Sequence, residues 1–135
     1  RGAWQLAEVA DRFEQFIAAF APCTALLERA RPSAADAFAL RCLLIHEYRR
    51  VLLRTVDLPP ALLPAQWPGD AAMALVGTLY RRVQADAAAW VCATLSNAEG
   101  LLPPPSAAFY ARFGGLVAPS VPPAASPRRA VAARV

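Results

Sequence analysis

Proline positions constrain this chain more strongly than any other feature of its sequence. Thirteen of the 135 residues are proline, and proline lacks the backbone N–H that a helix interior or a central strand requires. Four prolines fall within residues 57–69, and seven lie between residues 103 and 127. Regular structure is therefore expected in the stretches that remain, around residues 4–30, 34–54 and 69–96.

All three stretches carry the spacing of an α-helix, with apolar residues every three or four positions. No stretch shows the alternation of a half-buried strand, and the alanine-rich composition favours helix. Pro22 either ends the first helix or begins a further turn, and Cys23–Ala30 continues a helix-like pattern. The apolar faces consist of Leu6, Val9, Phe13, Phe16, Ile17 and Phe20 in the first stretch, and of Ala72, Leu75, Val76, Leu79, Val83, Ala87, Trp90 and Val91 in the third.

The second stretch has its own start signal and an unusually apolar centre. Ser33 is a good N-cap, and Asp36 follows three residues later in a capping-box-like arrangement. The helix is predicted from about Ala34 to about Arg54. Because Cys42–Ile45 is apolar nearly all round, we expect this helix to be buried on several sides and to occupy the centre of the bundle.

The connector at residues 57–69 is expected to pack as a structured loop over one end of the bundle. Four prolines forbid a long helix there, yet the segment carries apolar side chains that favour burial. A short fourth helix is predicted at Ser106–Phe113, after the proline triplet. The apolar residues of the connector are Leu58, Leu62, Leu63 and Trp67, and the anchors of the short helix are Phe109, Tyr110 and Phe113.

These patterns predict an all-α fold, an antiparallel three-helix bundle with a proline-rich connector and a short fourth helix, over residues 1–115. Residues 116–135 are rich in proline, alanine and arginine without periodicity, and we expect them to form a disordered tail. Asn97–Gly100 is expected to end the third helix. We expect the chain to be a fragment or a processed product, because it opens without methionine or a signal-peptide pattern.

The net charge of +4 is unevenly distributed along the chain. Residues 1–100 contain ten arginines and all ten acidic residues, so they sum to zero. The excess comes from Arg112, Arg128, Arg129 and Arg134. The net charge of the bundle therefore gives no indication of nucleic-acid binding, and the tail alone would give only a weak, salt-sensitive attraction. No apolar run is long enough to span a membrane, so no membrane partner is expected.

Catalytic, metal and cofactor chemistry find little support in the sequence. There is no glycine-rich phosphate loop, no pair of catalytic carboxylates and no recognisable nucleophile beside the single histidine. Three cysteines without a Cys-x-x-Cys pair argue against disulfides and structural zinc. Cys23, Cys42 and Cys92 are interpreted as small buried hydrophobic residues, with a redox switch as the minor alternative. We therefore expect no enzyme, no metal site and no cofactor.

Several motifs together resemble one protein family, the C-terminal domain of PaaX-type proteins. The connector contributes the most specific part of this resemblance, which covers about residues 4–115. The motifs are Leu43-Leu44-Ile45-His46-Glu47-Tyr48-Arg49-Arg50, Asp57-Leu58-Pro59, Leu62-Leu63-Pro64, Trp67-Pro68-Gly69, Leu79-Tyr80-Arg81, and Phe109 with Arg112-Phe113-Gly114.

The resemblance implies a function in transcription. PaaX-type proteins are repressors of bacterial phenylacetic acid degradation operons, with an N-terminal winged helix-turn-helix, a middle dimerising domain and a helical C-terminal domain. The first two parts are absent from these 135 residues. The resemblance thus implies a cytoplasmic homodimer that binds operator DNA through the missing winged-helix domain and responds to phenylacetyl-coenzyme A.

A cationic stripe is the candidate binding site for the effector or for DNA phosphates. His46, Arg50 and Arg54 are spaced four residues apart, with Arg49 on a neighbouring stripe, and Tyr48 and Trp67 could stack on a ring. The helix macrodipole favours cations at a helix C-terminus, which is a sufficient structural explanation of the same pattern. The alternative to a regulatory domain is a purely structural helical dimerisation or interaction domain without a ligand site.

Overall fold

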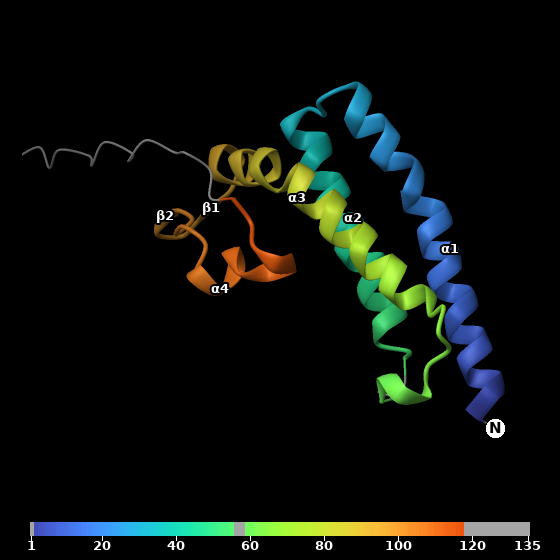
Figure 1. Ribbon diagram of the computed structural model, residues 1–135. Coiled ribbons are helices and arrows are strands. Elements are labelled where there is room, and N and C mark those ends of the chain that lie inside the picture. Colours follow the sequence, from blue (N-terminus) through green and yellow to red (C-terminus); the bar gives the residue numbers. More distant parts are fainter. Residues whose placement is uncertain (1, 56–58, 118–135) are drawn as a thin grey trace, which may run out of the picture.

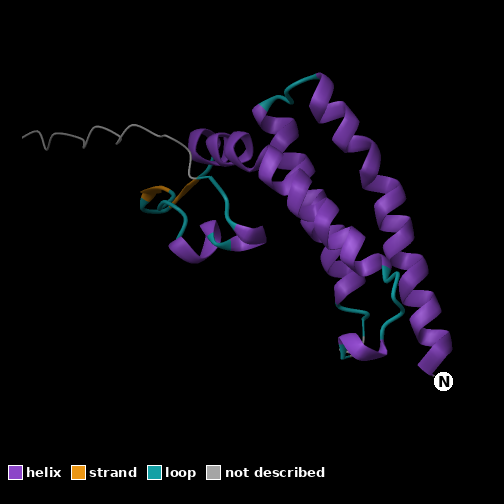
Figure 2. Ribbon diagram, viewed as in Figure 1, coloured by secondary structure: helices purple, strands orange, loops and turns teal. Residues whose placement is uncertain are grey.

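Three long helices form the body of the computed structural model, which describes residues 2–55 and 59–117 (Figure 1). They are α1 (Gly2–Arg29), α2 (Ala34–Leu52) and α3 (Pro68–Thr94). Consecutive helices run in opposite directions, and Figure 2 shows that helix dominates the described chain. The predicted all-α three-helix bundle is therefore confirmed.

Helix α1 passes through Pro22 without a break. Proline removes one hydrogen bond to the carbonyl four residues earlier, here Ala18. Both Pro22 and Ala18 are exposed, so water can satisfy that carbonyl. Of the two alternatives for Pro22, continuation of the helix is the one observed.

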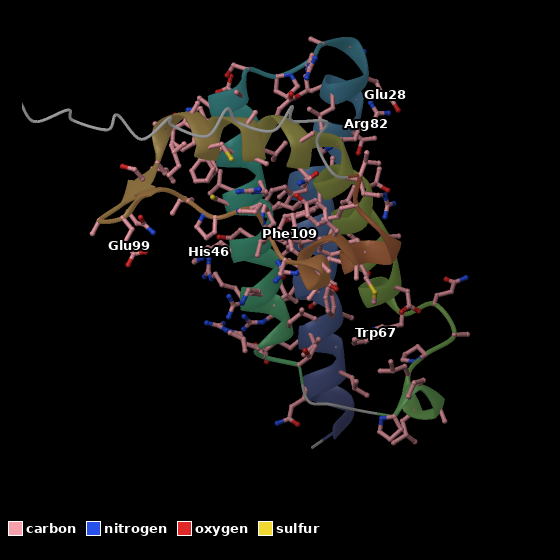
Figure 3. The ribbon with its side chains drawn as sticks, turned by 90° about the vertical axis from the view of Figure 1, so that its left-hand side faces the viewer. Glu28, His46, Trp67, Arg82, Glu99 and Phe109 are labelled. Carbon is pink, nitrogen blue, oxygen red and sulfur yellow. The ribbon has the colours of Figure 1, made fainter. Side chains whose placement is uncertain are left out.

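The loop between α1 and α2 is fixed by local and long-range polar contacts. Ser33 is the N-cap of α2, and its Oγ accepts a hydrogen bond from the backbone N–H of Asp36 at 3.1 Å, as the sequence predicts. Arg31 forms a bidentate ion pair with Asp86 of α3, in which two guanidinium nitrogens each donate to one carboxylate oxygen. Arg82 donates to the Leu27 carbonyl at 3.4 Å, and its charge lies 3.9 Å from Glu28, as Figure 3 illustrates.

Helix α3, and not α2, is the central element of the bundle. It packs against both other helices, whereas α1 and α2 contact each other much less. Its fully buried residues include Val76, Leu79 and Val83. The expectation that α2 is buried on several sides is wrong, because only Leu44 of its apolar centre is buried and the neighbouring Leu43 is 56% exposed.

The cysteines are also less buried than the sequence predicts. Cys42 and Cys92 are exposed and Cys23 is half-buried, so the interpretation of all three as buried hydrophobic residues is wrong. Cys42 lies on the outward face of α2, beside Leu43. An apolar neighbourhood in sequence did not translate into burial because α2 has only one helix to pack against closely.

A short hairpin follows α3, where the sequence shows no strand pattern. Strands β1 (Ser96–Asn97) and β2 (Gly100–Leu101) pair in antiparallel fashion. The Asn97 side chain accepts a hydrogen bond from the Glu99 N–H at 2.9 Å. Gly100 has φ 117°, which glycine adopts without strain. Strands of two residues are too short to show a period of two.

The C-terminal segment folds back onto α3 as a strap, comprising α4 (Ala107–Tyr110) and a 3₁₀ turn at Arg112–Gly114. Its aromatic anchors are those predicted: Phe109 and Phe113 lie 6.4 Å and 4.8 Å from the Tyr80 ring. Arg81 donates to the Phe113 carbonyl at 2.7 Å, which holds Phe113 at its positive φ of 53°. Gly77 lies in α3 where the strap approaches this helix. A Cβ there would lie 3.2 Å from Arg81 and 3.7 Å from Phe113, so the glycine leaves room for the strap.

Leu116, assigned from the sequence to the tail, is buried at the end of the strap. The remainder of the predicted disordered tail, from residue 118 onward, lies outside the described residues. Leu58 and Asp57 of the connector lie outside them as well.

The adjacent residues Leu44 and Leu43 provide a matched test of the packing of α2. Leu44→Ala should lower the free energy of unfolding by about 2–5 kcal/mol, because it removes a fully buried side chain. Leu43→Ala should cost less than about 1 kcal/mol. Urea denaturation of both variants measures the difference, and equal losses would show that α2 is buried on both sides.

The Arg31–Asp86 pair predicts a pH dependence of stability. The hydrogen bond from Arg31 lowers the pKa of Asp86 below its ordinary 3.8. A carboxylate with a lowered folded-state pKa stabilises the fold above its unfolded pKa, and this contribution is lost as the pH falls through the folded pKa. Between pH ~5 and ~2, the wild type should therefore lose more unfolding free energy than Asp86→Asn. Asp11→Asn, at an exposed position of α1, is the control and should behave as the wild type.

Candidate functional site

A groove of about 730 Å³ lies between the first half of α1 on one side and the residues just after α2 with the connector on the other. This volume is in the range of small-molecule sites. The walls are mostly apolar, and two arginines stand among them. The lining residues are Gly2, Gln5, Leu6, Glu8, Val9, Arg12, Arg54, Thr55, Leu62, Leu63 and Trp67.

A second groove of about 430 Å³ continues from the first between α1 and α2. Arg12 of α1 and Arg54 after α2 line both grooves, so they mark the junction. The second groove is lined further by Gln15, Phe16, Ala19, Phe20, Glu47, Arg50 and Val51. Such a groove exists because α1 and α2 each pack on α3 more closely than on each other.

The charges around the junction are partly paired. Arg12 lies 2.6 Å from Glu8, one turn earlier on α1. Arg50 contacts Glu47 at 3.1 Å through both carboxylate oxygens, the local pair expected from their spacing. Among the described residues, Arg54 has no carboxylate within ion-pairing distance. Solvent-exposed pairs of this kind contribute little to stability, so the arginines can exchange partners at small cost.

Trp67 is positioned by the residues around it in the Trp67-Pro68-Gly69 motif. Its ring meets Phe13 of α1 edge-on, with centroids 5.8 Å apart. Pro68 begins α3, where its missing N–H costs nothing. A Cβ on Gly69 would lie 2.9 Å from Trp67 Cδ1 and closer still to Nε1, so only glycine lets the indole fold over the helix start. The motif thus ties the connector to α1.

The six residues predicted from the sequence to bind an effector or a phosphate do not all lie at one site. Arg54 and Trp67 line the larger groove, and Arg50 lines the smaller one. His46 and Arg49 line neither groove and are exposed. In Figure 3, His46 projects from the outer side of α2, far from Trp67 beside the connector.

Tyr48 packs against the hydrophobic core. Its half-buried ring packs against Phe16 with centroids 5.6 Å apart. Burial raises the pKa of the Tyr48 hydroxyl, and the negative charge of Asp70 raises it further. Tyr48 therefore stays neutral at physiological pH and holds α1 against α2.

The groove contains residues that the sequence did not single out as functional. Arg12, Leu6 and Val9 all come from α1, where they fit an ordinary amphipathic helix. Nothing in their local spacing signals a site, because the groove is made by the approach of the connector and the end of α2. Only the pairing of elements far apart in sequence reveals their role.

Within residues 2–55 and 59–117, no group of three or more histidine, cysteine, aspartate or glutamate side chains could hold a metal ion. In the same part of the chain, no helix is long and apolar enough to cross a membrane.

Comparison with known proteins gives the family. The model of the PaaX-like protein C-terminal domain matches residues 4–93, from the start of α1 to the end of α3. The chain belongs to this family. The matched residues include the connector and all lining residues of both grooves except Gly2, whereas the strap lies beyond them.

A curated relative supports the same assignment. The transcriptional repressor PaaX of Escherichia coli (strain K12) is 41% identical over 115 residues, which cover 84% of this chain. The chain spans 36% of the length of that relative. The resemblance inferred from the connector motifs is thus confirmed.

The role of Gly69 predicts an effect on Trp67. Gly69→Ala should displace the indole, changing its fluorescence and lowering the melting temperature, because the new methyl group occupies the place of the ring. Gly2→Ala, whose Cβ meets no atom within 4 Å, is the control. Unchanged Trp67 emission in Gly69→Ala, measured with Trp4 and Trp90 replaced by Phe, would contradict this account of the motif.

Proposed function

We propose that this chain is the C-terminal regulatory and dimer-supporting domain of a transcriptional repressor of phenylacetate catabolism. It is a regulator and not an enzyme, and it acts in the cytoplasm. The observation that carries the proposal is the 41% identity to a transcriptional repressor over 84% of the chain. The match of the domain family from α1 to α3 supports the same function.

The charge distribution supports a division of labour. Residues 1–100 are neutral, with ten arginines and ten acidic residues. A domain that binds DNA by itself needs a basic surface, because phosphate contacts provide most of its affinity. We therefore assign operator binding to another part of the repressor, which the family resemblance implies is a winged-helix domain outside these 135 residues. The resemblance likewise implies that the helical domain contributes to a homodimer.

Regulation in this proposal is a shift between two dimer populations. Phenylacetyl-coenzyme A binds the conformation with low operator affinity more tightly than the one with high affinity. A coupling free energy of about 1–3 kcal/mol would change operator affinity roughly 5- to 150-fold. Without such a difference in affinity, the effector could not relieve repression.

The candidate residues for effector or phosphate binding are His46, Tyr48, Arg49, Arg50, Arg54 and Trp67. Among them, the geometry favours Arg54 and Trp67, because they lie in one groove with a volume suited to a ligand. Arg50 in the adjoining groove is the next candidate. Arginine suits this role because its planar guanidinium can bind a carboxylate or phosphate through two hydrogen bonds.

The function is tested with the intact repressor and an operator fragment. Phenylacetyl-coenzyme A should lower operator affinity by at least about fivefold, and calorimetry should detect its binding. The 135-residue chain alone should show no sequence-specific operator binding. Operator affinity that does not respond to the thioester, together with no heat of binding, would contradict the proposal and favour a purely structural dimerisation domain.

A further inference from the structure

The junction of the two grooves brings together two kinds of surface that one ligand could use. On one side lies an apolar compartment with Leu6 and Val9 from α1 and Leu63 and Trp67 from the connector. At the junction stand Arg12 and Arg54, each lining both grooves. An apolar wall that ends at two guanidinium groups is complementary to a molecule with an apolar body and an anionic end.

The contacts of the arginines leave them able to bind such an anion. Arg12 pairs with Glu8 at 2.6 Å, and a third of the Arg12 side chain is exposed. Arg54 is exposed and follows directly on the last turn of α2. A bound anion would therefore displace solvent and would not have to break a buried ion pair.

We propose that this groove binds an amphipathic anion, with its acyl or aryl part against Trp67 and its carboxylate or phosphate between Arg12 and Arg54. The proposal rests on the effector response proposed above and deepens it by assigning the site and by adding Arg12, Leu6 and Val9 to it. The stripe residues Arg49 and His46 take no part in binding.

The location of the groove gives ligand binding a structural consequence. Its walls come from α1 on one side and from the end of α2 with the connector on the other. Helices α1 and α2 contact each other less than each contacts α3. A ligand that bridges them fixes the position of α1 relative to α2, which is the kind of differential stabilisation that a population shift requires.

Fluorescence titration of the 135-residue chain tests the proposal. With Trp4→Phe and Trp90→Phe in the background, Trp67 is the only tryptophan. The probes are phenylacetyl-coenzyme A, phenylacetate and free coenzyme A. Phenylacetyl-coenzyme A should change the Trp67 emission. Free phenylacetate binding as well as the thioester identifies a carboxylate as the anion, whereas weaker phenylacetate binding identifies the phosphates of coenzyme A.

Matched variants decide where the probe binds. Arg12→Ala and Arg54→Ala should each weaken binding about 10- to 100-fold, the loss expected for a hydrogen bond to a charged group. Arg49→Ala, an exposed arginine outside both grooves, should change affinity less than about threefold. Arg49 and Arg54 are exposed and Arg12 is partly exposed, so melting temperatures should stay close to that of the parent chain, and circular dichroism checks this.

Three results would overturn the groove assignment. They are the absence of any probe binding, binding that Arg49→Ala weakens but Arg54→Ala does not, and free coenzyme A binding as tightly as the thioester. If the intact repressor still released its operator in response to the thioester, the effector response would stand and only the groove would be wrong. Conversely, Arg54-dependent binding by the chain without operator release would support the groove and contradict the proposed function.

Discussion

The buried face of α3 is the constraint on which the rest of this structure depends. Val76, Leu79 and Val83 are fully buried, and α1, α2 and the C-terminal strap each pack on this helix. Apolar burial on this scale is the main favourable term for a small helical domain. Since α1 and α2 each pack mainly on α3, they contact each other only loosely, and the groove lies between them.

Contacts at the two ends of the bundle, polar at one and aromatic at the other, position α1 on α3. At one end, Arg31 pairs with Asp86 and Arg82 reaches the end of α1. At the other, Trp67 meets Phe13, and Gly69 leaves space for the indole. The first contact closes the bundle, whereas the second forms part of a ligand-sized groove. A domain arranged in this way can hold a stable core and still change the spacing of α1 and α2 when a ligand binds.

Much of the fold could be predicted because its signals are local. The start of α2 was predicted from Ser33 and Asp36. The short helix of the strap was predicted from its aromatic anchors Phe109, Tyr110 and Phe113. The sequence favoured α2 as the central helix because its middle is apolar, yet Leu43 in that segment is exposed and α3 is central. The apolar content of a helix does not show how many other helices pack against it. The hairpin at residues 96–101 could not be predicted, because strands of two residues are too short to show an alternating pattern. In the site, Arg54 and Trp67 were candidates from the sequence, whereas Arg12 depends on the meeting of distant segments.

Hydrogen exchange of the 135-residue chain, with and without phenylacetyl-coenzyme A, tests whether α3 supports the other helices and whether ligand binding acts on the contact between α1 and the connector. Backbone amides around Val76–Val83 should exchange slowest in both states, and the thioester should slow exchange in the first half of α1 and at the end of α2. Slowest exchange in α2, or protection by the thioester confined to the outer face of α2 around His46 and Arg49, would contradict these expectations.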